Sequence, residues 1–431
     1  MRFRCFSLER ENISKTAVKS TGGNEVQKAG KSQVTVGRQN KTIITNTMYT
    51  MGGMLLMNGV LQLVIYPLLN RQMGAEQLGN LLYIMGLVSI LCPSVGQSLN
   101  TSRLVVRRDY PVTNGDYDWT ILIFGVAGSA AALGFSGKEL HTPSAYIATF
   151  LLLMITIFRY YGDVEYRLNL NYKRYFIYYL MISLGYLGGF FLYRISGNWF
   201  LIFLLGESLA LLYVGISGTV FRSFFARSAS FSVVIRRGLF LTLSYLITNT
   251  TLNMDRLVLN RLMGNLAVTE YYVVSLIGKT MVLLIAPVNT IVISYLTKRR
   301  ETLTKKQFLK GVAAGLGISA LFFLFCEIAT PIFIRLFYGD LYESVKGLIL
   351  VTNLTQILGL LSAFLFILVL TFTDERWQLW LQAAHFVLLL VLAAAGTRAF
   401  GILGFAWASL AANSLRVGAV ILLGVAKARK G

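Results

Sequence analysis

The stretch LLNRQMGAEQLGNLLYIMG (68–86) returns later in the chain as VLNRLMGNLAVTEYYVVSLIG (258–278). Leucine, asparagine, arginine, methionine and glycine recur in the same order in the two LNRxMG motifs. Each motif closes the first helix of a set of six long apolar runs, at the same end of its set. The two copies therefore predict two six-helix halves in the same orientation, related by a pseudo-twofold axis along the membrane normal.

The composition requires a lipid environment. Of the 431 residues, 55% are hydrophobic and only 14% are charged, whereas soluble domains carry about 25% charged residues. So few charges cannot cover the surface of a globule of this size, so much of that surface must face lipid. The sequence predicts an all-α polytopic membrane protein with about 12 transmembrane helices, in two pseudo-symmetric six-helix bundles with a central cavity. The predicted spans are 42–69, 77–99, 118–137, 143–161, 174–194, 198–219, 237–263, 269–297, 308–336, 344–372, 378–398 and 401–425.

Three segments follow from this pattern. Residues 1–41 are polar and basic without an apolar period, which predicts a disordered cytoplasmic tail. Residues 42–220 form the expected N-terminal six-helix bundle and 221–431 the C-terminal one. The loops between the runs are short and leave no room for a catalytic domain, so we do not expect an enzyme.

The basic residues report topology rather than nucleic-acid binding. The 40 Lys and Arg residues outnumber the 19 Asp and Glu residues, but they are scattered over short loops instead of one domain. Assigned to alternate sides, 30 lie with the two termini and 7 lie opposite, which places both termini in the cytoplasm. Three basic residues remain inside the spans: Arg256, Lys279 and Arg416. The scattered cysteines and histidines predict no metal site, and no cofactor is expected.

Several segments resemble the Wzx-type polysaccharide flippases of the multidrug/oligosaccharidyl-lipid/polysaccharide exporter superfamily. The resemblance is carried by YPLLNRQMGAEQLGNLLY (66–83), NMDRLVLNRLMGNLAVTEYYVVSLIGK (253–279) and APVNTIVISYL (286–296). Two weaker stretches, 334–350 and 401–423, add to it. The resemblance implies two six-helix bundles that move polyprenyl-pyrophosphate-linked oligosaccharides across the bacterial cytoplasmic membrane for capsule, exopolysaccharide or O-antigen synthesis. It also implies the lipid bilayer, a polymerase and glycosyltransferases of the same pathway as partners.

Two differences from other members of this superfamily help to assign the chain to one of its branches. Proton-coupled drug exporters of this superfamily typically carry an acidic residue in the first span, whereas residues 42–69 contain none. Lipid II flippases usually have about fourteen spans, against the twelve counted in this chain. The alternative function is an ion-coupled multidrug exporter of the same superfamily.

Basic residues inside spans are the first candidates for a substrate site, because a charge in the bilayer normally faces a cavity or a partner. Lys279 lies near the midplane, where a cation would replace the lost hydration of a pyrophosphate. The alternative is a lysine that snorkels or is paired within the bundle. Arg256 is a second candidate anion contact. Arg416 would meet incoming phosphate or snorkel to anionic lipid.

Acidic, amide and proline residues complete the predicted site. Asp255 would adjust the electrostatic environment of Arg256 or serve as an ion-coupling acid, unless it forms a purely structural ion pair. Glu207 has no partner nearby in the sequence. Its buried carboxyl would either take part in proton coupling or form a hydrogen bond to a neighbouring helix. Glu327 would also serve ion coupling, or lie at the membrane interface. The amides Asn253 and Asn289 would bind sugar hydroxyls or hold helices together. Pro93 and Pro287 each interrupt a spanning helix and are the predicted gating positions.

Overall fold

The computed structural model describes most of the chain as helix. The chain divides into two units, Met1–Met48 and Tyr49–Gly431, and nearly all of the described residues belong to the second. The expected tail, residues 1–41, lies outside the described residues. The structure describes residues 45–46, 48–137, 139–298, 303–370, 372–373 and 375–428, without the side chains of 283–298, 375 and 378.

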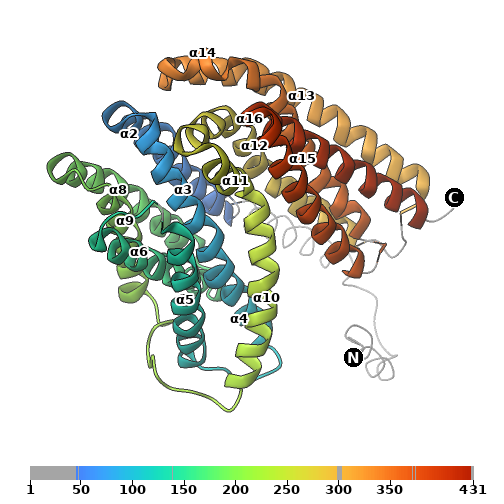
Figure 1. The fold of residues 1–431 in the computed structure, drawn as a ribbon. Helices are drawn as coiled ribbons and strands as arrows, with labels where there is room; N and C mark the ends of the chain where they lie inside the picture. The colour runs from blue at the N-terminus through green and yellow to red at the C-terminus, as the bar shows by residue number, and fades with distance from the viewer. Residues whose placement is uncertain are drawn as a thin grey trace, which may run out of the picture. The chain divides into compact units, whose positions relative to one another are not determined.

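Every named element is a helix, and the helices of the first half follow one another with short connections (Figure 1). The first helix continues from Met48 to Met73. Its later part and the helices that come after it are η1 Val60–Ile65, α2 Tyr66–Met73, α3 Ala75–Cys92, η2 Pro93–Gln97, α4 Ser98–Val106, α5 Asn114–Ser136, α6 Pro143–Gly162, α7 Val164–Leu168, α8 Tyr172–Ser196 and α9 Phe200–Ser217.

The second half has fewer but longer helices. They are α10 Phe231–Leu252, α11 Met254–Met263, α12 Asn265–Lys298, α13 Lys305–Phe337, η3 Gly339–Leu341, α14 Tyr342–Val345, η4 Lys346–Leu348, α15 Ile349–Leu370 and α16 Glu375–Lys427.

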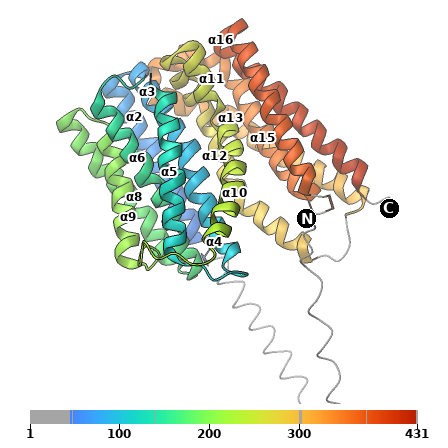
Figure 2. The same ribbon diagram turned by 60° about the horizontal axis from the view of Figure 1, so that its bottom comes forward.

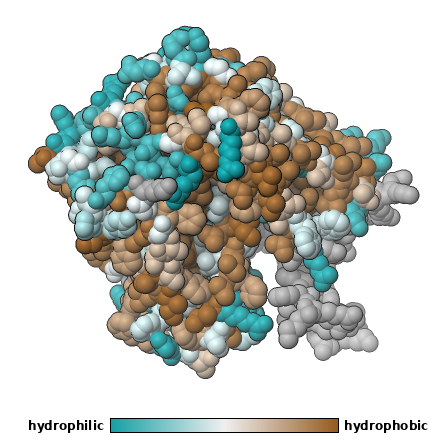
Figure 3. All heavy atoms as spheres, viewed as in Figure 1, coloured by the Kyte–Doolittle hydropathy of each residue, from teal (hydrophilic) through white to brown (hydrophobic). Residues whose placement is uncertain are grey.

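The predicted twelve spans are confirmed. Ten stretches of the described residues are long and apolar enough to cross a membrane. The 34-residue helix α12 adds another. Helix α16 supplies two spans, because the backbone of Phe400 and Gly401 is not helical and joins two helices. Hydrophobic residues cover much of the viewed face of the molecule (Figure 3), as expected for a surface in lipid.

The helices form the two-bundle layout predicted from the repeat (Figure 2). In the first half, α8 packs on α9, and α6 packs on α9, α5 and α3. In the second half, α15 packs on α12, α13 and α16. Helix α10 packs mainly on α4 and η2 of the first half, through the hydroxyl pairs Ser98–Thr242 (2.8 Å) and Thr101–Tyr245 (3.2 Å). Helix α10 therefore links the two bundles at the end where α4 lies.

Most spans begin or end a few residues away from their predicted bounds, and two of them also differ in the course of the helix. The run 237–263 is interrupted at Asn253, whose backbone angles (φ −114°, ψ 18°) lie outside the helical range and separate α10 from α11. The run 344–372 becomes helical as α15 only from Ile349, because short 3₁₀ and α turns occupy 339–348. Both differences arise because hydropathy reports apolar length but not backbone direction.

Candidate functional site

The LNRxMG motifs form the same turn in both halves. Gly74 (φ +82°) ends α2 and Gly264 (φ +89°) ends α11, and each amide donates to the carbonyl of the motif asparagine, Asn70 or Asn260. Only glycine adopts such positive φ values without steric cost. The internal repeat predicted from the sequence is thus a repeat of local structure.

The helices that follow the two turns contact each other very closely. A Cβ atom on Gly79 of α3 would lie 1.9 Å from the carbonyl oxygen of Asn265 in α12. Reciprocally, Thr269 of α12 donates its hydroxyl to the carbonyl oxygen of Ala75 in α3 (2.7 Å). Gly79 and Thr269 each stand five positions after the turn glycine of their own half. The contact between the halves therefore follows the predicted pseudo-twofold axis.

The motif arginines each reach the other half. Arg71 donates to the carbonyl of Leu336 in the last turn of α13 (3.4 Å), and Arg261 donates to the carbonyl of Phe135 in the last turn of α5. Helices α5 and α13 are each the third span of their half. A cation at a helix C-terminus satisfies free carbonyls and the negative end of the helix dipole. Each half thus caps the third span of the other.

A carboxylate strengthens this junction. Glu139, in the loop after α5, accepts hydrogen bonds from the side-chain amides of Asn260 (3.1 Å) and Asn265 (3.0 Å). One residue of the first half thereby holds both sides of the Gly264 turn. We call Arg71, Glu139, Asn260, Arg261 and Asn265 the turn clasp.

Replacing Glu139 with alanine is expected to loosen the end of the molecule that the turn clasp holds. Two charge-assisted hydrogen bonds are lost, which at a partly exposed site amounts to about 1–3 kcal/mol. Hydrogen–deuterium exchange of residues 75–82 and 265–272 should then become roughly 5- to 150-fold faster. Glu76→Ala is the control, because it removes an exposed carboxylate from the same end; equal acceleration in both variants would contradict the clasp.

Lys279 and Asp255 form an ion pair. The ammonium of Lys279 lies 2.6 Å from a carboxylate oxygen of Asp255, which is buried, while 29% of the Lys279 side chain is exposed. The sequence left several interpretations of Lys279 open, and the structure shows the one in which this lysine is paired within the bundle. Asp255 thus forms an ion pair between helices, which is one of the alternatives left open, and Arg256 faces elsewhere because adjacent residues of a helix point about 100° apart.

Arg256 faces the first half. Its alkyl chain packs where Gly86 of α3 has no side chain, its Nη1 donates to the carbonyl of Leu82 (3.4 Å), and its guanidinium lies 5.5 Å from the ring centre of Tyr272. Its Nε is buried without a hydrogen-bond partner among the described residues. No carboxylate of the described chain pairs with it. Arg256 is thus a cation between the bundles whose charge is not balanced by direct contact.

Two of the amide and proline candidates, Asn253 and Pro93, lie around the interruption of the seventh span. Asn253 donates to the carbonyl of Asn249 (2.9 Å), and Asn249 donates to Ser94 (3.0 Å), which follows Pro93. Pro93 opens the π-helical segment η2, so the predicted irregularity is present there, and its gating role stays a prediction. The side chains of Pro287 and Asn289 lie outside the described residues.

Glu207 has no partner nearby in the sequence, but the structure bonds it to two neighbouring helices, which is one of the alternatives left open. Arg159 of α6 donates to it at 2.5 Å and Tyr186 of α8 donates at 2.7 Å. The side chains of Arg159 and Glu207 are each only 4% exposed. Arg159 lies in the last turn of α6, and its side chain points into the bundle rather than to the surface. The pair links α6, α8 and α9 in the core of the first bundle.

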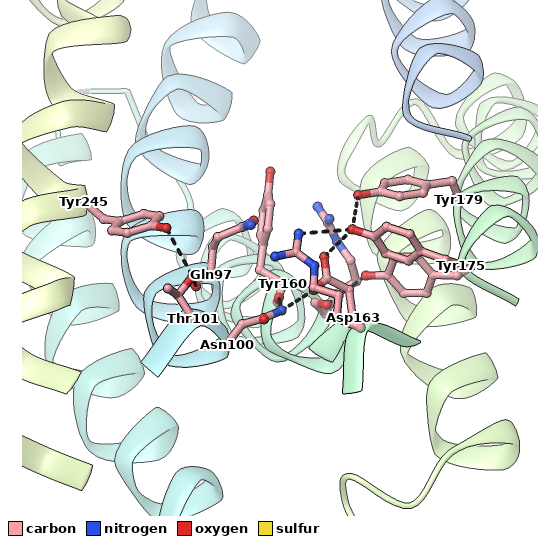
Figure 4. A network of polar contacts seen from close by, with 11 residues as sticks. Gln97, Asn100, Thr101, Tyr160, Asp163, Tyr175, Tyr179 and Tyr245 are labelled. Carbon is pink, nitrogen blue, oxygen red and sulfur yellow. Dashed lines mark hydrogen bonds and ion pairs between the residues drawn. The ribbon is translucent and has the colours of Figure 1, made fainter. Parts of the chain in front are cut away.

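A second polar cluster lies at the C-terminal end of α6, around Asp163 (Figure 4). Asp163 accepts hydrogen bonds from Asn100 of α4 and from Tyr175 of α8 (2.9 Å), and Tyr175 contacts the hydroxyl of Tyr179 (3.2 Å). Both tyrosines are buried, so they belong to the core of the first bundle. The spacing of Asp163 and Arg167 was a signal for this cluster in the sequence, since the two residues lie four positions apart and form an ion pair (3.5 Å).

The remaining candidates lie in the second bundle. Glu327 is half-buried in α13 and accepts a hydrogen bond from Asn353 of α15 (2.9 Å). Arg416 is half-buried in α16 and forms no ion pair with any residue whose side chain is described. The structure brings Asp255, Arg256 and Lys279 together, and Glu207 belongs to the separate core of the first bundle.

The fold defined by these helices is that of a polytopic membrane protein with two six-helix bundles, and solved structures share it. The chain is similar to the lipid II flippase MurJ in an inward closed conformation (TM-score 0.65, 12% identity, 90% of this chain and 88% of that one). It is also similar to a multidrug resistance MATE family transporter of the MOP superfamily in an inward-facing conformation (TM-score 0.61, 15% identity, 88% and 93%). The outward-facing conformation of a MATE family transporter matches with a TM-score of 0.55 (16% identity, 89% and 94%). No protein-family model and no curated protein matches the chain.

Proposed function

We propose that this protein is a flippase that moves polyprenyl-pyrophosphate-linked oligosaccharide units from the inner to the outer leaflet of the bacterial cytoplasmic membrane by ion-coupled alternating access. The observation that carries the proposal is Arg256, a cation at the junction of the two bundles without a carboxylate partner in the described chain. Such a guanidinium can offer paired N–H donors to a phosphate and replace its hydration.

The ion pair beside Arg256 offers a route to coupling. Protonation or ion binding at Asp255 would release Lys279, so that two cations instead of one would meet the pyrophosphate. Glu327 in the second bundle is a further acid available to the coupling ion, and Arg416 would receive substrate nearer the end of α16. Glu207 is the weaker coupling candidate, because Arg159 and Tyr186 already satisfy it.

The turn clasp supports the alternating-access part of the proposal. It closes one end of the junction between the halves, where α3 and α12 touch backbone to backbone. In the proposed orientation this is the outer end, so the state described would accept substrate from the cytoplasm. Release would require both motif arginines to leave their helix ends, while Pro93 and Pro287 let the second and eighth spans bend.

The Arg256→Gln variant is expected to lose about tenfold or more of its flux, because one charge-assisted phosphate contact is removed. Flux is measured in proteoliposomes as the fraction of a fluorescent polyprenyl-diphosphate disaccharide that becomes accessible to an external quencher. The dissociation constant for the same lipid in detergent should rise in parallel, which separates a substrate contact from a defect in gating.

Two comparisons complete this experiment. Arg256→Lys keeps the charge and should retain part of the flux, and Arg398→Gln removes an exposed arginine of α16 as the control. Wild-type flux and binding in Arg256→Gln would contradict the anion site. If cationic dyes were transported and the lipid were not, the drug-exporter alternative would replace the flippase.

A further inference from the structure

A basic hollow lies at the end of the second span, apart from the Arg256 junction and from the polar core of the first bundle. Its volume is about 370 Å³, and it is lined by Arg103, Arg107, Tyr110, Pro111 and Val112. Two of its five lining residues are arginines, and none is acidic. The hollow belongs to the first bundle and to the loop between α4 and α5.

Arg103 is held in place by neutral groups. Its Nη1 donates to the hydroxyl of Tyr161 and its Nη2 to the side-chain oxygen of Asn114, both at 2.5 Å. The guanidinium carbon also lies 5.5 Å and 5.9 Å from the ring centres of Tyr117 and Tyr161. These contacts fix the orientation of the guanidinium but leave its positive charge and its other N–H donors available.

The nearby acids do not neutralise the hollow by direct contact. Asp109 pairs with Arg237 of α10 (3.6 Å) rather than with either lining arginine. Asp118 is buried within electrostatic range of Arg103, but neither of its oxygens has a hydrogen-bond partner in the described part of the chain. Arg107 is exposed and forms no ion pair there. The hollow therefore keeps an excess of positive charge.

The length of the second span places this charge at the level of lipid headgroups. The helical stretch Ala75–Val106 has 32 residues, or about 48 Å at 1.5 Å per residue. The hydrocarbon core is about 30 Å thick and the whole bilayer about 40–45 Å. With the Gly74 turn at one surface, Arg103 lies beyond the hydrocarbon on the other side. Tyr110 fits this depth, because tyrosine is enriched at membrane interfaces.

We propose that this hollow binds the phosphate of an anionic lipid headgroup, with Arg103 as the oriented contact and Arg107 as the second cation. Paired guanidinium donors match the geometry of a phosphate, and at this depth lipid is the most concentrated source of phosphate. The site is distinct from the junction that contains Arg256, so it stands whether or not the protein is a flippase.

The test measures binding of phosphatidylglycerol to the purified full-length protein by native mass spectrometry. The Arg107→Gln variant is expected to weaken the tightest binding event about tenfold. It is the decisive variant because Arg107 is exposed and its replacement spares the fold. Arg103→Lys keeps the charge but loses the fork of donors, and should weaken binding less. Arg108→Gln is the matched control, because it removes an exposed arginine one position away that does not line the hollow.

Each outcome decides between sources or against the site. Weaker lipid binding in Arg107→Gln with less than a twofold change in Arg108→Gln supports the headgroup site. If phosphatidylglycerol binding is unchanged but inorganic pyrophosphate binding is lost in Arg107→Gln alone, a soluble phosphate replaces the headgroup as the ligand. If Arg107→Gln and Arg108→Gln behave alike toward both probes, only a diffuse basic surface exists and the proposal is overturned.

Discussion

Replacing Glu207 with alanine is expected to destabilise the protein by about 3–5 kcal/mol, because Arg159 would remain charged and buried without its partner. The guanidinium has no route to water, since its side chain is 4% exposed. Tyr186 would lose its acceptor as well. Since α6, α8 and α9 all meet at this pair, the first bundle as a whole should lose heat resistance.

The fraction of protein that stays monodisperse after heating, followed by size-exclusion chromatography in detergent, measures this effect. The informative control replaces both partners, as Arg159→Met with Glu207→Leu. A buried ion pair exchanged for apolar residues of similar size is often neutral, so the double variant should be much more stable than Glu207→Ala. If Glu207→Ala resisted heat as well as the wild type, the pair would not be a structural element of the core.

Enlarging Gly79 to alanine is expected to shift the protein toward states in which the turn-clasp end is open. The added Cβ would meet the backbone oxygen of Asn265, which cannot rotate away. Overpacking typically costs roughly 1–3 kcal/mol, which corresponds to a shift of about 5- to 150-fold in the equilibrium between closed and open ends. Transport should fall because the closed end can no longer form fully.

Spin labels on Glu76→Cys and Leu266→Cys report this shift as a longer distance, in a background without Cys5, Cys92 and Cys326. Both label sites are exposed and lie just after the two turns. Gly59→Ala is the control, because a Cβ at that position meets no atom within 4 Å. An unchanged distance in Gly79→Ala would show that the closed end accommodates the methyl group, and would contradict the role of this contact in the equilibrium.

The features visible in the sequence were those that depend on one helix at a time. Apolar length predicted twelve spans, and the repeated LNRxMG motif predicted two equivalent halves whose turns have the same backbone geometry at Gly74 and Gly264. Proline predicted the irregular helix at Pro93. These signals are local, because helix formation, helix termination and membrane insertion are decided by neighbouring residues.

The pairings between helices could not be predicted in the same way. Asp255 meets Lys279 instead of serving its neighbour Arg256, and this depends on how α11 and α12 are rotated about their axes. Glu207 meets Arg159, which lies 48 positions earlier in the chain, so the sequence could not identify its partner. Glu139 gave no signal, since a single acid in a short loop is ordinary until the fold brings Asn260 and Asn265 to it.

The crossed caps of Arg71 on α13 and Arg261 on α5 have a consequence for the ancestry of the chain. A cap within its own half would be useful to a single six-helix protein, but the arginines of these motifs each cap a helix of the opposite half. Two identical six-helix chains related by a twofold axis would make both contacts by symmetry. The present arrangement is what gene duplication and fusion of such a homodimer would leave, with each half still recognising a former partner subunit.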